Sequence, residues 1–80
     1  MEIYEFKSLK ESKQIEITQR GVFLASRTDS GNHISLYNLD GFYVEVYYSI
    51  DLERVVMIRA FDSTDPLERY LDGEEFKGLI

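Results

Sequence analysis

The chain has 80 residues, a formal net charge of −6 and no cysteine, and 44% of its residues are hydrophobic. This length fits one domain, so we expect a single domain over residues 1–80, with 73–80 as a tail. The absence of cysteine excludes disulfides, thiol catalysis and thiolate metal sites. The hydrophobic content argues against disorder, and the acidic charge disfavours a nucleic-acid partner, which needs clustered Lys and Arg.

The N-terminus lacks the pattern of a targeting signal. It carries Glu2 and Glu5 and has neither the basic start nor the apolar run of a secretion signal. No apolar stretch approaches the roughly 20 residues that a membrane-spanning helix needs. The sequence therefore predicts a cytoplasmic protein that does not associate with membranes.

The first element permits two interpretations. Ser8 and Glu11 have the spacing of a capping box for a helix over residues 9–20, which Gly21 would end. However, the segment Ile15–Thr18 alternates between apolar and polar residues like a strand, and Ile and Thr are poor helix formers. We predict the helix, because its cap and its stop agree in register.

Four segments rich in β-branched and aromatic residues follow, separated by residues typical of turns. Asp40-Gly41 is a pair that favours a tight hairpin, because Gly tolerates positive φ. Connections this short make neighbouring strands antiparallel. The predicted strands are Val22–Thr28, His33–Leu39, Phe42–Tyr48 and Val55–Phe61.

A second helix is predicted near the C-terminus. Asp65 can cap it, Pro66 suits its first position, Glu68 completes a capping box and Gly73 ends it. The predicted fold is therefore an α+β domain. It consists of a four-stranded antiparallel meander with an N-terminal helix and a short C-terminal helix packed on one face.

Several short motifs occur along the chain, among them Gly21-Val22-Phe23-Leu24-Ala25, Phe42-Tyr43-Val44-Glu45-Val46, Ile58-Arg59-Ala60-Phe61 and Ser63-Thr64-Asp65. Together they resemble a family of short, uncharacterised bacterial single-domain proteins. The resemblance extends from about Ser8 to Leu71 and implies a helix before Gly21. It implies no activity, because none is known for the family.

The alternation of side chains along a strand divides the third strand into two faces. We expect the helices to cover the side with Phe42, Val44, Val46 and Tyr48, which leaves Tyr43, Glu45 and Tyr47 on an outer face. A register that pairs Glu45 with Arg59 would add about 0.2–1 kcal/mol of stability. The same register would place Val55, Met57 and Phe61 on the outer face.

This outer face is the candidate interaction surface, because Tyr and Arg are common anchors at protein interfaces. We expect a non-enzymatic domain that forms a homodimer or docks a protein partner through this face or through an exposed edge strand. In the alternatives, the tail or a helix covers the face, the tyrosines lie flat in solvent, or the face binds a small molecule. The candidate residues are Arg27, Tyr37, Tyr43, Glu45, Tyr47, Met57 and Arg59.

A second candidate site lies where the last strand meets the C-terminal helix. Arg59, Ser63, Thr64 and Asp65 would place a cation and hydroxyl groups near a helix N-terminus, which suits a small anion or a weak enzymatic role. No catalytic residue, cofactor or metal site is predicted, since His33 is the only histidine. We also expect no pocket of adequate size in so short a chain.

Overall fold

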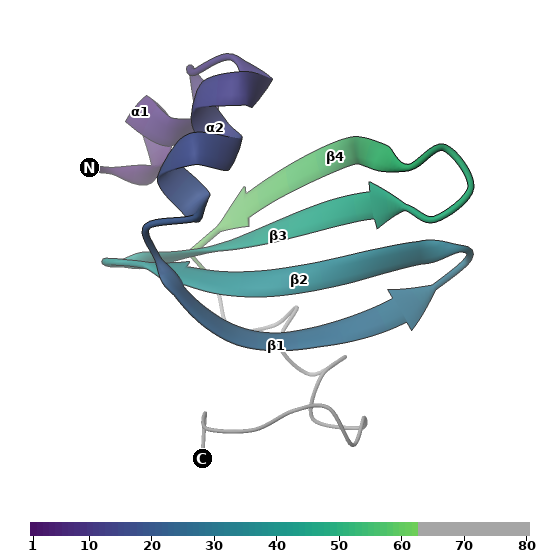
Figure 1. Ribbon diagram of the computed structural model, residues 1–80. Helices are drawn as coiled ribbons and strands as arrows, with labels where there is room; N and C mark the ends of the chain where they lie inside the picture. Colours follow the sequence, from purple (N-terminus) through teal and green to yellow (C-terminus); the bar gives the residue numbers. More distant parts are fainter. Residues whose placement is uncertain (63–80) are drawn as a thin grey trace.

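The computed structural model describes residues 1–62, where two short helices precede a four-stranded sheet (Figure 1). The predicted C-terminal helix lies outside the described residues. The elements are α1 (Ile3–Lys7), α2 (Glu11–Thr18), β1 (Val22–Asp29), β2 (Asn32–Leu39), β3 (Phe42–Ser49) and β4 (Arg54–Phe61).

The sheet is the predicted antiparallel meander, with strand order β1-β2-β3-β4. Each observed strand is one residue longer than its predicted segment. The β2–β3 turn has positive φ at both central residues, 24° at Asp40 and 103° at Gly41. This conformation matches the right-handed twist of the two strands and explains why Asp-Gly marks the hairpin in the sequence.

The N-terminal region is helical, as predicted, but its boundaries and caps differ from the prediction. Helix α2 begins at Glu11, and its N-cap is Lys10 rather than Ser8. Ser8 instead ends α1, where its hydroxyl donates a hydrogen bond to the carbonyl oxygen of Glu5 at 2.7 Å. The predicted capping box is therefore wrong, and so is the strand alternative for residues 15–18.

The sheet has two faces, which we name after neighbouring residues of β3. On the Val44 face, the ring of Phe6 from α1 lies 5.5 Å from the ring of Phe42, and both side chains are buried beside Val44. Ile17 of α2 packs against the same cluster. Packing of an N-terminal and a C-terminal helix together on one face stays a prediction.

Gly21 connects α2 to β1 at a close approach of the backbone to β2. A Cβ atom at this position would collide with the side chain of Leu39 and lie 2.7 Å from the carbonyl oxygen of Asn38. The leucine side chain can move, but the carbonyl belongs to the paired strand β2. Only glycine therefore fits without a shift of the backbone.

Gly21→Ala is accordingly expected to destabilise the domain by about 1–3 kcal/mol, the range for overpacking at a tight site. Urea denaturation followed by circular dichroism measures this loss. Gly31→Asn is the matched control, because nothing lies within 4 Å of a Cβ placed there and Asn tolerates its φ of 81°. Equal stability of Gly21→Ala and the wild type would contradict the close approach.

Candidate functional site

The strand register brings together most of the residues predicted for the outer face. Glu45 lies opposite Arg59, so this predicted pair is confirmed, and Met57 and Phe61 share its face. Val55 does not, because a bulge in β4 places it opposite Tyr48 on the other side. We call the side that carries Glu45 the Glu45 face.

Two further predictions about the faces need correction. Tyr37 lies opposite Val44 and therefore belongs to the Val44 face, not to the outer set. Tyr48 is on the Val44 face, as predicted, but its side chain is 40% exposed rather than inside the core. Arg27 lies opposite Ile34, which in turn lies opposite Tyr47, so Arg27 shares the Glu45 face.

A buried polar network occupies the centre of the Glu45 face. Glu45 is 0% exposed, and its two carboxylate oxygens lie 3.5 Å from guanidinium nitrogens of Arg27 and Arg59. The hydroxyl of Tyr47 donates to Glu45 Oε1 at 3.2 Å. Arg59 Nη1 also donates to that hydroxyl, at 3.4 Å. One carboxylate is thus held between two guanidinium groups.

Arg59 keeps its positive charge over a wide pH range. The hydrogen bond with Tyr47 raises the pKa of Arg59, and the nearby charge of Glu45 raises it further, while burial acts in the opposite direction. A charge with so high a pKa persists throughout the neutral range. Buried ions without such partners would be strongly destabilising.

The centre of the Glu45 face is therefore interior rather than a docking surface. Tyr47 is only 7% exposed, which contradicts its predicted outward position. The hydroxyl of Tyr47 points into the polar network, where it forms hydrogen bonds with Glu45 and Arg59. Three further residues of this face are buried as well: Ala25, Ile34 and Leu36. Both faces of the sheet thus contribute to the core.

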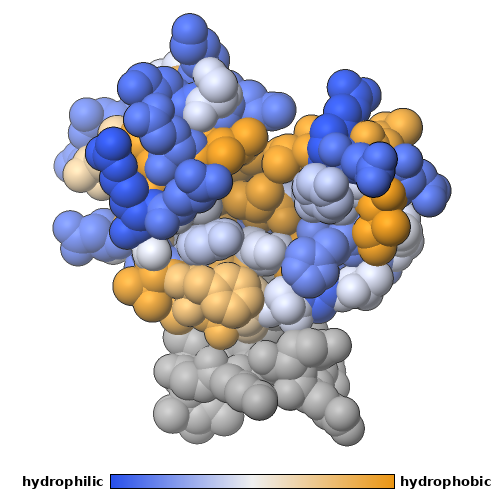
Figure 2. Space-filling model, viewed as in Figure 1, coloured by the Kyte–Doolittle hydropathy of each residue, from blue (hydrophilic) through white to orange (hydrophobic). Residues whose placement is uncertain are grey.

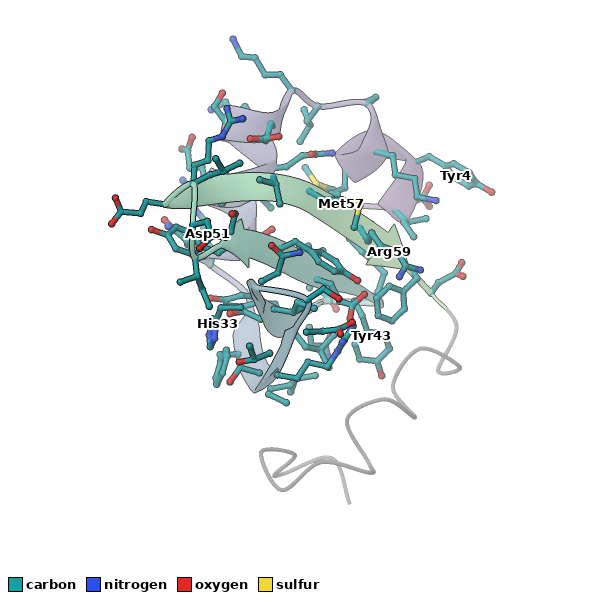
Figure 3. The ribbon with its side chains drawn as sticks, turned by 90° about the vertical axis from the view of Figure 1, so that its right-hand side faces the viewer. Tyr4, His33, Tyr43, Asp51, Met57 and Arg59 are labelled. Atoms are coloured by element: carbon teal, nitrogen blue, oxygen red, sulfur yellow. The ribbon has the colours of Figure 1, made fainter. Side chains whose placement is uncertain are left out.

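Of the other predicted residues, Tyr43 and Met57 lie at the rim of the Glu45 face, and the rest follow residue 62. Tyr43 stacks on Phe61 with 5.7 Å between ring centroids. Met57 is 44% exposed on β4 (Figure 3). Ser63, Thr64 and Asp65 lie outside the described residues, so the anion site with Arg59 stays a prediction.

The Val44 face carries none of the charged residues of the four strands. It presents an uncharged surface over β1 and β2, which we call the β1–β2 patch. Phe23 in this patch is 55% exposed and makes an edge-to-face contact with Tyr37 at 5.6 Å. The charged strand residues, Arg27, Asp29, Glu45, Arg54 and Arg59, all belong to the Glu45 face. The patch consists of Phe23, Ser26, Thr28, His33, Ser35 and Tyr37.

The sequence contains only a partial signal for this patch. Phe23 and Ser26 are three positions apart, a spacing that normally puts two side chains on opposite faces. They share a face because β1 has a bulge between Phe23 and Ala25. A strict alternation of side chains would therefore have placed Phe23 and Ser26 on opposite faces of the sheet.

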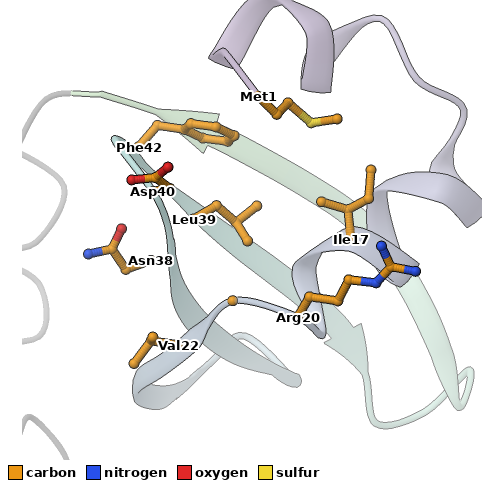
Figure 4. Close-up of a pocket in the computed structure, with 9 residues that line it drawn as sticks. Met1, Ile17, Arg20, Val22, Asn38, Leu39, Asp40 and Phe42 are labelled. Carbon is orange, nitrogen blue, oxygen red and sulfur yellow. The ribbon is translucent and has the colours of Figure 1, made fainter.

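A cavity of about 330 Å³ lies between the C-terminal end of α2 and the β2–β3 turn (Figure 4). The expectation that this chain has no pocket of adequate size is therefore wrong, because 330 Å³ is within the range of ligand sites. Among residues 1–62, no group of three or more His, Cys, Asp and Glu side chains could hold a metal ion. In the same part of the chain, no helix is long and apolar enough to cross a membrane.

Comparison of the chain with protein-family models, with curated proteins and with solved structures found no match. The resemblance to short bacterial proteins therefore stays a prediction. Any function must be argued from the surfaces and the cavity that the structure describes.

Proposed function

We propose that this protein is a non-enzymatic interaction domain that self-associates through the β1–β2 patch. The observation that carries the proposal is a large aromatic side chain, Phe23, that is 55% exposed on a sheet face without charged strand residues. A large exposed aromatic side chain surrounded by uncharged polar residues is a candidate anchor for a protein interface. In Figure 2, the area below the central hollow combines apolar residues with residues of intermediate hydropathy.

The chemistry of the patch favours a second copy as the partner. An uncharged surface is buried at least cost against another uncharged surface, since no charge then loses its water. The same patch on a second copy meets this condition, and a twofold axis would bring the two patches together. The net charge of −6 opposes association of two copies through any face, and the uncharged patch brings no further like charges into contact.

The edge strands are a less favourable route to association. Both β1 and β4 contain a register shift of the bulge type, at Phe23/Ala25 and opposite Tyr47/Tyr48. Bulges disturb the row of backbone groups that a partner strand would pair with, and natural sheets use them to protect their edges. We therefore place the contact on the patch rather than on an edge.

Sedimentation equilibrium tests the proposal. The wild type is expected to show a dimer at micromolar concentration, and Phe23→Ser is expected to weaken the dimer by about tenfold or more, as for an interface anchor worth over 1 kcal/mol. The variant should remain folded, because Phe23 lies mostly outside the core. Circular dichroism checks this.

Tyr4→Ser is the matched control. Tyr4 is 78% exposed and extends from α1 away from the sheet (Figure 3). It is thus an exposed aromatic residue that does not belong to the patch, and its replacement should leave the dimer unchanged. A mass of one chain for the wild type, or equal dimerisation of Phe23→Ser, would show that the patch is not a self-association site.

A further inference from the structure

The cavity beside the β2–β3 turn has an apolar interior and a polar rim. Ile17 of α2 and Leu39 of β2 face each other across it, and Phe42 and Val22 extend the apolar lining (Figure 4). A mainly apolar concavity with a few polar groups is the usual form of a small-molecule site. The cavity is separate from the β1–β2 patch, so it does not depend on self-association.

Two charged residues lie on opposite sides of the cavity in Figure 4, and only one of them has an ion-pair partner among residues 1–62. Arg20 forms an ion pair with Glu16 at 3.5 Å, next to the last turn of α2. Asp40, in contrast, has no ion-pair partner among residues 1–62. Of these two charged side chains, Asp40 is therefore the one that no ion pair engages in the described part of the chain.

The surroundings of Asp40 strengthen this negative character. A neighbouring cavity of about 300 Å³ shares Asp40 and Phe42 with the first one and is also lined by Glu2 and Asp62. Carboxylates thus extend the polar end beyond Asp40, while the opposite side combines the apolar Ile17 with the ion-paired Arg20. A ligand that fits both ends has an apolar body and a positive charge.

We propose that this cavity binds a small organic cation, an apolar or aromatic amine whose ammonium group pairs with Asp40. The apolar body would pack between Ile17 and Leu39, where it replaces water against apolar surface. The ammonium group would remain near the rim, so that its charge is only partly desolvated. The proposal concerns a ligand site and goes beyond the proposed interaction function.

Titration of the ¹⁵N-labelled full chain with 2-phenylethylamine tests the site. Amide shifts are expected at Ile17, Leu39 and Asp40. The neutral analogue 2-phenylethanol should bind about fivefold more weakly, as should the amine to Asp40→Asn, since a partly exposed ion pair contributes up to about 1 kcal/mol. Asn suits the turn because it tolerates positive φ.

Asp51→Asn is the matched control, because it removes the same charge from the β3–β4 loop, outside the cavity lining. It should bind the amine as the wild type does. The proposal is overturned if the amine causes no shifts at the cavity, if 3-phenylpropionate binds as tightly as the amine, or if Asp40→Asn leaves the affinity unchanged.

Discussion

Glu45→Ala is expected to destabilise the domain by about 3–5 kcal/mol, because it removes the carboxylate shared by two guanidinium groups, and the ion pair that Arg27 keeps among residues 1–62 is with the exposed Asp29. The carboxylate is 0% exposed and lies 3.5 Å from each of two guanidinium groups. Arg27 has only 14% of its side chain exposed, so it cannot turn fully into water without a rearrangement of the sheet. Tyr47 also loses its acceptor.

Urea denaturation followed by far-ultraviolet circular dichroism measures this loss, with the slope of the transition as a check on two-state behaviour. If Glu45→Ala fails to fold, Glu45→Gln keeps an oxygen acceptor and the side-chain volume, and a smaller loss is expected. Glu16→Ala is the matched control, because Glu16 forms two ion pairs on the surface and its side chain is 50% exposed. The control should change stability by less than about 1 kcal/mol.

A double-mutant cycle isolates the coupling between Arg59 and Glu45. Arg59→Met removes the guanidinium group from the network. Its effect on the free energy of unfolding should be non-additive with that of Glu45→Gln, because the two side chains share one network. The raised pKa of Arg59 means that its contribution is complete below its ordinary pKa and is lost only as the pH rises through the higher folded-state value. Coupling should therefore stay constant across neutral pH. Additive effects of the two substitutions would contradict the network.

The strands were predictable because their signals are local. The Asp-Gly turn and the alternation of β3 fix the hairpin, and an opposite-charge pair was enough to predict the register of Glu45 with Arg59. The burial of Glu45 was not predictable in the same way. It depends on Leu36 and Ala25, which lie on other strands, and the side of Ala25 is set by the bulge in β1.

The candidate sites show the same limit. Tyr37 was assigned to the wrong face although the two-residue turn sets Leu39 opposite Phe42 and therefore Tyr37 opposite Val44. The cavity was missed because it forms between α2 and the β2–β3 turn, elements that are distant in sequence. Its distinguishing residue in the sequence, Asp40, was interpreted only as part of a turn.

Helix α1 was also missed, and it supplies the second large expected effect. Its five residues are too few for a stable isolated helix. It must therefore be held by tertiary contacts, and Phe6 provides two of them. The ring is 0% exposed against Phe42, and the carbonyl oxygen accepts a hydrogen bond from Gln14 Nε2 at 3.0 Å, which links α1 to α2.

Phe6→Ala is expected to destabilise the domain by about 3–5 kcal/mol, the range for truncation of a buried aromatic side chain. The carbonyl group of residue 6 remains, so the loss reports the ring and the cavity that it leaves. Denaturation with urea measures the total effect. Amide hydrogen exchange should show the largest loss of protection in α1 and α2, with a smaller loss in β2 and β3, because local unfolding begins where the anchor is removed.

Tyr4→Ala makes the same kind of truncation two positions earlier in the same helix, at a side chain that is 78% exposed. It should change stability by no more than about 0.5 kcal/mol, as for other surface substitutions. The contrast between these two variants isolates burial from helix propensity, because both replace an aromatic residue of α1 with alanine. Equal stability of the two variants would mean that α1 does not contribute to the core and that its packing does not bury the Val44 face.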